Sequence, residues 1–382
     1  MKKIGIDVRM MGLENAGIGR YIANLVREIK NEKLKIKNWR LYLFVKNKTQ
    51  ISSSTEQLNN LTIIEVRARH YSLKEQFLIP WIVWQSKLDL VHFPHFNVPI
   101  FCPVPFVVTI HDLIKHKSRG FSTTTRFPLI YWLKYAVYLL VFGLAVKRAK
   151  KIIVPSEAVK KELIKRYKLS PDKVIVTYEG VGNKFQISND KLQIEIPNLK
   201  LLKKYKIKKP FIIYTGSLYP HKNIERLIKA VKSLKLELVI CCSRSVFLER
   251  MKKKIKGMKA EKLVKLPGFV SDEELVRLYR EAIAFVQPSL MEGFDLTVIE
   301  AMAVGLPVVI SDIPVHREIA GLAAVYFDPE KVEDMIEKIK TVIESKKLRN
   351  SLIEKGLERS KRYKWRQTAQ ETLKIYESCF GL

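Results

Sequence analysis

Two glutamates separated by seven residues, Glu292 and Glu300, form the most informative pattern in the sequence. They follow the short apolar segment Ile283–Val286, which predicts a buried strand. A turn from a strand into a helix directs free N–H groups and the positive end of the helix dipole at a ligand, which favours phosphate. Neighbouring carboxylates then suit sugar or ribose hydroxyls, because a carboxylate is a pure acceptor. The alternative is a capping box of Thr297 and Glu300, with Glu292 solvated.

A second strand–loop–helix segment surrounds Lys222. The predicted strand Phe211–Tyr214 leads through the loop Thr215–Lys222 into the predicted helix Asn223–Leu234. A positive charge at a helix entrance opposes the helix dipole, and it becomes favourable when an anion lies between them. The alternative is a solvated lysine in a lysine-rich protein.

Two motifs in the first half of the chain could contact the same ligand. Gly17 and Gly19 follow the predicted strand Lys3–Val8, after a loop running from Met10 to Gly19. This loop is longer than in dinucleotide-binding folds, and the second strand lacks a terminal acidic residue, so NAD or flavin binding is not expected. His111 follows an apolar strand at the edge where open α/β sheets bind ligands. It could bond a sugar or move a proton, or it could be a structural histidine bonded to its neighbouring loop.

The sequence gives little support for a metal. His92 and His95 have an HxxH spacing, but no nearby carboxylate or cysteine completes a ligand set, so we expect structural roles. There is no Asp-x-Asp to bridge a cation to a diphosphate. The cysteines form no CxxC pair, which argues against zinc and disulfide frameworks and favours a reducing compartment. They are Cys102, Cys241, Cys242 and Cys379.

Strands and helices alternate along the chain, which is typical of parallel βαβ units. A length of 382 residues suggests two domains, since a domain has ~100–200 residues. The weakly periodic stretch Gly182–Lys209 separates the two series. The other predicted strands are Leu41–Val45, Leu90–His92, Val107–Ile110, Ile152–Pro155, Glu237–Cys241, Val264–Leu266 and Pro307–Ser311. Predicted helices include Arg20–Ile29, Leu73–Trp84, Glu157–Tyr167, one capped by Ser271, and the interrupted stretch Val332–Tyr376.

The chain is strongly basic, with 69 Lys and Arg against 38 Asp and Glu, a net charge of +31. Such a surface favours an acidic partner: nucleic acid, anionic lipid or a phosphorylated ligand. No nucleic-acid-binding signature is present, and the basic residues are not clustered with aromatic ones, so nucleic acid is not an expected partner. An alternative explanation of the charge is adaptation to high temperature.

One apolar segment, Phe127–Val146, could contact a membrane. It is interrupted by Lys134, and basic residues flank it on both sides. Its uninterrupted part is too short to span a bilayer, which takes ~20 residues. A buried core helix, a helix in the lipid interface and a true span remain open. Asp7 precedes any apolar region at the N-terminus, so we expect no secretory signal.

Taken in order, these motifs resemble the retaining glycosyltransferases of family 4, and the resemblance covers nearly the whole chain. The most specific part is Glu292-Gly293-Phe294…Glu300-Ala301-Met302, which is similar to the E-x7-E motif of that family. Lys222 matches its phosphate-binding lysine, and His111 its active-site histidine. Gly17 and Gly19 match the glycine loop of its acceptor-side domain.

The resemblance implies an α/β protein with the GT-B fold, in which two Rossmann-like, doubly wound domains face a cleft. Residues 1–188 then form the acceptor-side domain, and residues 200–362 the nucleotide-sugar domain. Residues 363–382 form a C-terminal helix that packs back on the first domain.

It also implies roles for individual residues. Glu292 holds hydroxyls of the donor sugar, and Glu300 holds the ribose. Lys222, with N–H groups near Leu296 and Thr297, stabilises the departing diphosphate, and His111 lies near the transferred sugar. No covalent nucleophile is expected. The remaining residues assigned to the donor are Gly17, Gly19, Ser217, His221, Gly293 and Phe294.

Two departures from the family pattern stand out. Ser217 occupies a position where the family often has arginine, so a diphosphate cation is missing or supplied by another side chain, with His221 nearest in sequence. The segment Glu179–Gly182 replaces the family's Asn-Gly-Val-Asp, which concerns contacts between the domains rather than the donor site. A catalytically silent subunit is therefore an alternative.

Within the family, the motifs look like the mannosyltransferase branch. We therefore expect hexose transfer from GDP-mannose to a glycan or lipid-linked acceptor in cell-surface polysaccharide synthesis, without a metal or other cofactor. A UDP-sugar donor is the alternative. Acceptor contacts are expected around Ser118–Arg126. A cytoplasmic enzyme, peripheral on the anionic inner face of the membrane, fits the charge and the apolar segment.

Overall fold

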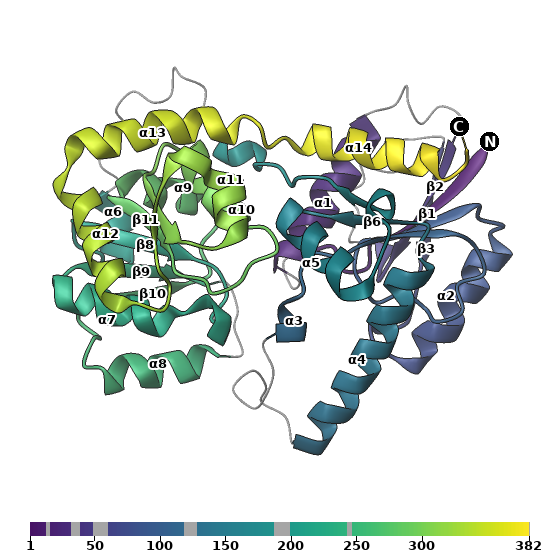
Figure 1. Cartoon of the computed structure of the whole chain (residues 1–382), viewed down its shortest axis with the longest axis horizontal. Helices are drawn as coiled ribbons and strands as arrows, with labels where there is room; N and C mark the ends of the chain where they lie inside the picture. Colours follow the sequence, from purple (N-terminus) through teal and green to yellow (C-terminus); the bar gives the residue numbers. More distant parts are fainter. Residues whose placement is uncertain are drawn as a thin grey trace. The chain divides into compact units, whose positions relative to one another are not determined.

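The chain forms two compact units, each built on its own parallel sheet (Figure 1). The computed structural model describes residues 1–12, 16–31, 39–48, 60–117, 128–186, 199–242 and 247–381. Unit 1 combines Met1–Lys115, Thr124–Gly180 and Lys364–Leu382, and unit 2 is mainly Val181–Tyr363. The chain therefore leaves unit 1, builds unit 2 and returns to unit 1.

The sheet of unit 1 has the strand order β3-β2-β1-β4-β5-β6-β7, with every pair parallel. Several strands are almost fully buried, as expected for a sheet covered on both faces. The strands are β1 Lys2–Asp7, β2 Trp39–Val45, β3 Leu61–Glu65, β4 Leu90–Phe93, β5 Phe106–Thr109, β6 Lys151–Val154 and β7 Val174–Val176.

The helices of unit 1 divide between the two faces of this sheet. Parallel crossovers are right-handed, so the connections β3→β4, β5→β6 and β6→β7 place α2, α4 and α5 on one face. The connection β1→β2 runs in the opposite direction and places α1 on the other face, where it packs against α14. The helices are α1 Ala16–Asn31, α2 Leu73–Gln85, α3 Ile114–Lys117, α4 Pro128–Arg148, α5 Glu157–Tyr167 and α14 Trp365–Ser378.

Unit 2 is a second doubly wound sheet, with the parallel order β10-β9-β8-β11-β12-β13. Its strands are β8 Phe211–Thr215, β9 Glu237–Cys241, β10 Val264–Gly268, β11 Ala284–Gln287, β12 Val308–Ser311 and β13 Ala324–Phe327. Its helices are α6 Leu199–Lys204, α7 Ile224–Leu234, α8 Leu248–Gly257, α9 Asp272–Glu281, α10 Leu296–Ala303, α11 Pro314–Ala320, α12 Val332–Glu344 and α13 Lys346–Ser360.

The elements differ from the sequence prediction at several places, including the following three. Helix α1 begins at Ala16, so Gly17 and Gly19 lie in its first turn and not in a loop. Strand β3 was not predicted, because its residues are only half-buried and do not alternate cleanly. Helix α6 lies within the stretch that was predicted to lack a strong period.

The apolar segment after residue 127 forms helix α4. Val141, Phe142, Ala145 and Val146 at its C-terminal half are buried, which matches the core-helix alternative there. Most residues from Trp132 to Leu140 are exposed. None of the described helices has both the length and the hydropathy needed to cross a bilayer. The expected acceptor segment Ser118–Arg126 lies outside the described residues.

Candidate active site

The two predicted anion-binding turns of unit 2 meet through an ion pair between Lys222 and Glu292. The Lys222 Nζ lies 2.5 Å from Glu292 Oε1, and both side chains are largely buried. The two turns follow β8 and β11, which are neighbours in the sheet, so they leave it at the same edge. A further bond from Leu290 N–H to the His221 carbonyl, 2.8 Å, joins the loops. The solvated alternatives for Lys222 and Glu292 are therefore wrong.

The turn that holds Lys222 is tightly constrained. After β8, Gly216 has φ +152°, and a Cβ there would lie 2.7 Å from the Tyr214 hydroxyl. That hydroxyl donates to the Ser217 carbonyl at 2.6 Å. The turn ends at Asn223, which has φ 59° and donates through Nδ2 to the Pro288 and Pro329 carbonyls. These bonds fix the position of Lys222 relative to the neighbouring loop.

Helix α10 begins four residues after Glu292, and Asp295 caps its N-terminus. The Oδ1 atom of Asp295 accepts hydrogen bonds from Thr297 N–H at 3.1 Å and from the Thr297 hydroxyl at 2.6 Å. Thr297 and Glu300 consequently do not form the capping box that the spacing allowed. Because Thr297 N–H already donates to Asp295, Leu296 N–H is the nearer candidate for a phosphate oxygen.

A buried polar network supports this cap. Asp295 Oδ2 accepts from Gln287 Nε2 at 2.6 Å and faces His316 Nε2 at 3.3 Å. Burial alone would raise the pKa of Asp295, but the bond from His316 and the charge of Lys222 outweigh it and hold that pKa at about 2. Asp295 is therefore an anion near pH 7, and its charge and that of Lys222 attract each other.

Burial shifts the pKa values of two titratable groups in this site, Glu292 and His221. Burial raises the pKa of Glu292 above its ordinary value, although the Lys222 ammonium opposes the shift. Burial and the same ammonium lower the pKa of His221 to about 3. His221 is thus neutral near pH 7, so it can donate a hydrogen bond to a diphosphate but does not replace a missing arginine charge.

The remaining predicted residues of this site lie around the same helix. Gly293 is buried, and the ring of Phe294 packs edge-on against Tyr363 at 5.8 Å. Glu300 lies in the second turn of α10 and is fully buried. A Cβ at Gly182 would lie 4.0 Å from Glu300 Oε1. A ribose contact therefore requires a movement that exposes this carboxylate.

His111, Gly17 and Gly19 belong to unit 1 and not to the cluster around Lys222. His111 Nε2 lies 3.0 Å from the Pro94 carbonyl, and Nδ1 lies 3.4 Å from Glu179 Oε1. Its ring also packs edge-on against Tyr21. Both ring nitrogens thus have partners, as the structural alternative predicts, and a role in transfer requires one of them to exchange its partner.

The two glycines of α1 have different surroundings. A Cβ at Gly19 would lie 2.1 Å from the Gly12 carbonyl oxygen, so this position allows two backbones to touch. Around Gly17, which is exposed, no described atom lies within 4 Å of an added Cβ. Gly19 therefore has a packing role, and only Gly17 is free to approach a ligand.

His92, expected to be structural, lies in a buried chain of hydrogen bonds in unit 1. Its Nδ1 bonds the Tyr376 hydroxyl at 2.6 Å, and its Nε2 bonds the Thr109 hydroxyl at 2.8 Å. Burial, helped by the charge of His111, lowers the pKa of His92 to about 3. His92 thus ties α14 to the sheet as a neutral ring.

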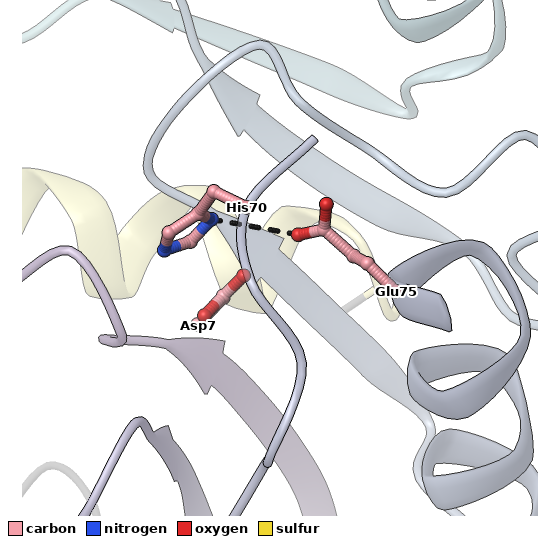
Figure 2. A group of neighbouring side chains, drawn as sticks. All are labelled: Asp7, His70 and Glu75. Carbon is pink, nitrogen blue, oxygen red and sulfur yellow. Dashed lines mark ion pairs between the residues drawn. The ribbon is translucent and has the colours of Figure 1, made fainter. Parts of the chain in front are cut away.

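Asp7, His70 and Glu75 form another polar group, which sequence reasoning missed (Figure 2). His70 Nδ1 lies 3.4 Å from Glu75 Oε1. The three could hold a cation, but Arg9 already bonds both carboxylates, at 2.6 Å to Asp7 and 2.5 Å to Glu75. A guanidinium thus supplies the positive charge that a metal would bring, and this group is a structural ion network.

Family models match both units. The model described as Glycosyltransferase Family 4 matches residues 16–183, and the model described as Glycosyl transferases group 1 matches residues 199–359. The chain belongs to the family 4 glycosyltransferases. The family, the enzyme class and the GT-B fold predicted from the sequence are confirmed for this glycosyltransferase.

The similarity to known proteins covers most of the chain. O-antigen chain mannosyltransferase B of Escherichia coli is 24% identical, covering 94% of this glycosyltransferase and 96% of the relative. O-antigen chain mannosyltransferase RfbU of Salmonella typhimurium (strain LT2) is 29% identical, covering 62% and 60% respectively. The crystal structure of Anabaena HepE in complex with UDP-glucose has a TM-score of 0.72 at 16% identity and covers 100% of both chains. The latter likeness concerns the fold.

Proposed function

We propose that this glycosyltransferase transfers mannose from GDP-mannose to a glycan or lipid-linked acceptor in cell-surface polysaccharide synthesis, with retention of anomeric configuration. The observation that carries the proposal is the buried Lys222–Glu292 pair between two strand–loop–helix turns. The printed names of the two O-antigen mannosyltransferases favour mannose and a polysaccharide product. With a lipid-linked acceptor, the enzyme works at the inner face of the membrane.

The pair suits a donor with a negative diphosphate and a hydroxyl-rich sugar. A diphosphate oxygen competes with Glu292 for Lys222, whose ammonium has three donors. Once Lys222 turns to the phosphate, the Glu292 carboxylate is free to accept bonds from sugar hydroxyls. In this proposal the ion pair holds both groups in place before the donor arrives, which lowers the cost of ordering them.

In the transfer step, the bond from the sugar anomeric carbon to the diphosphate oxygen breaks on the face where the acceptor oxygen bonds. The acceptor hydroxyl gives its proton to the departing diphosphate. Lys222 and the N-terminus of α10 stabilise the charge that develops on that leaving group. Protein groups thus account for the leaving-group charge, and we propose that no metal is needed.

Calorimetry with GDP, UDP, ADP and CMP in the presence of EDTA tests the donor. Micromolar binding of GDP alone supports the proposal, and mannose transfer from GDP-mannose is then measured with the anomeric configuration of the product. Preference for UDP moves the donor to a UDP-sugar. Binding that needs added Mg²⁺ contradicts the metal-free step, and no binding at all favours a silent subunit.

A further inference from the structure

Helix α2 presents a row of large apolar side chains to solvent. Leu73, Phe77, Trp81 and Trp84 recur every three or four residues, so they lie on one face of the helix. All of them are exposed, with Leu73 81%, Phe77 76% and Trp84 70% accessible. The opposite face is buried in the core of unit 1, so α2 is apolar on both faces. A surface helix with this pattern has an exposed face that water does not favour.

Helix α4 has a similar exposed face in its N-terminal half. Leu133, Val137 and Leu140 recur at the same helical spacing, and each is more than half exposed. Trp132 and Leu139 lie next to this row and are also exposed. Tyr138 packs against the core, and the buried residues of the helix begin at Val141.

The two exposed faces belong to the same side of unit 1. Both helices cover the same face of the sheet, and their buried residues share one apolar core. The loop between them bonds to both: Ile100 N–H donates to Gln76 of α2, and Arg148 of α4 donates to the Ile100 carbonyl. The next residue, Phe101, is 78% exposed. The exposed faces of α2 and α4, together with Phe101, are named the α2–α4 surface.

Positive charge accompanies this surface. Lys74 and Lys134 lie within its helices and Lys87 just after α2, all exposed, and none forms an ion pair with another described residue. Residues 128–151 contain no Asp or Glu. In residues 66–88, Glu75 is buried against Arg9, so no exposed carboxylate offsets the lysines there.

We infer that the α2–α4 surface docks this glycosyltransferase on an anionic lipid bilayer. Aromatic and aliphatic side chains on one face of a helix, with lysines along it, are what a helix lying in the lipid interface needs. Tryptophan favours the interfacial depth, and lysine stems reach the headgroups. The inference depends on unit 1 alone and holds whichever donor unit 2 binds.

The tryptophans supply an internal probe. The chain has five: Trp39 and Trp365 are buried, whereas Trp81, Trp84 and Trp132 lie on the α2–α4 surface. Purified protein is mixed with vesicles of phosphatidylglycerol and phosphatidylcholine, and with vesicles of phosphatidylcholine alone. We expect co-sedimentation and a blue shift with the anionic vesicles, together with quenching by lipids brominated on their acyl chains. Binding to neither vesicle type overturns the inference.

Variants separate the apolar and the charged parts. Phe77→Glu with Leu133→Glu places carboxylates on exposed positions of both helices and is expected to weaken vesicle binding at least about tenfold. Lys74→Gln, Lys87→Gln and Lys134→Gln together are expected to weaken it roughly 100-fold on anionic vesicles only. The matched control is Phe269→Glu with Leu322→Glu, which changes exposed apolar residues of unit 2. A control that weakens binding equally contradicts the assignment of the surface.

Two further measurements make the outcome decisive. Sedimentation equilibrium tests whether a second copy covers the surface: a dimer that Phe77→Glu with Leu133→Glu dissociates, without vesicle binding by wild type, overturns the lipid assignment. Circular dichroism and nucleotide calorimetry on the same variants show whether they remain folded. Variants that lose vesicle binding but keep nucleotide affinity support the inference. If the wild-type protein binds no nucleotide, only the proposed function is contradicted.

Discussion

At the scale of single residues, the candidate site is an ion pair, and in the proposed function each partner also binds part of the donor. Lys222 and Glu292 come from separate turns, and both side chains are largely buried where they meet. A buried pair of this kind contributes little net stability, because desolvation offsets much of the attraction. Its value is therefore positional: it keeps a cation and a carboxylate ready where a diphosphate and a sugar would meet.

Neutralising either partner should reduce transfer strongly. For Lys222→Met and Glu292→Gln we expect losses of about 100-fold or more in kcat/KM with GDP-mannose, since each removes a group bonded to the donor. Lys229→Met, an exposed lysine of α7, is the matched control. Steady-state kinetics measure the effect, and wild-type rates in both variants would show that the site is misassigned.

Acid should weaken donor binding at a higher pH than for an ordinary glutamate. Burial raises the pKa of Glu292, so the carboxylate loses its charge, and becomes a weaker hydrogen-bond acceptor, already at a pH above its usual pKa of 4.5. Lys222 lowers that pKa, so Lys222→Met should move the acid limb to still higher pH. Calorimetric titrations of GDP-mannose from pH 4 to 8 measure this limb. An unchanged limb in Lys222→Met would contradict the coupling.

The types of these residues could be read from the sequence, but not their contacts. Lys222 and Glu292 each follow a strand, yet only the neighbouring positions of β8 and β11 reveal that they meet. The role of Asp295 could have been predicted, because an aspartate just before an apolar helical run is an N-cap candidate. The bond from Arg9 to Glu75 could not, since the two residues are 66 positions apart in the sequence.

At the scale of elements, α1 shows how tertiary contact decides a helix boundary. Two glycines near its start argued for a loop, because glycine is a weak helix former. The close approach of the Gly12 backbone to Gly19 favours the helix all the same. Alternation and apolar runs predicted most strands, whereas the half-buried β3 lacked both signals.

The two glycines of α1 should respond oppositely to alanine. Gly19→Ala forces a Cβ into the Gly12 carbonyl and should destabilise the protein by about 1–3 kcal/mol. Gly17→Ala meets no described atom and should be neutral or stabilise by up to about 1 kcal/mol. Urea unfolding measures both. Equal effects would show that Gly19 has no special packing role.

The buried His92 of β4, which bonds Tyr376 of α14, predicts that the free energy of unfolding depends on pH. Burial lowers the pKa of His92 to about 3 from its ordinary 6.5, so the unfolded chain takes up the proton first as the pH falls. The contribution is complete above about pH 6.5 and is lost progressively toward pH 3. His92→Gln should reduce the slope of the unfolding free energy by about 1.4 kcal/mol per pH unit between pH 6 and 4. Parallel slopes in urea titrations would contradict it.

At the scale of the whole molecule, each unit has its own apolar core, and α14 belongs to unit 1. Tyr376→Ala removes a fully buried ring of α14 and should destabilise unit 1 by about 3–5 kcal/mol. Nucleotide binding by unit 2 should stay within about twofold of wild type at a temperature where the variant is folded. Calorimetry of binding and of unfolding checks both, and a parallel loss of nucleotide affinity would contradict independent cores.

The return of the chain to unit 1 has a consequence for how the protein is made. Residues Val181–Tyr363 lie between the two parts of unit 1 that α1 and α14 join, so the ribosome completes unit 2 before it delivers α14. Domains generally fold as units during synthesis. Unit 2 can therefore fold first, while the surface of α1 that α14 later covers remains exposed to solvent. The half that is translated earlier is the half that matures later, and its unfinished apolar surface is where a chaperone would bind.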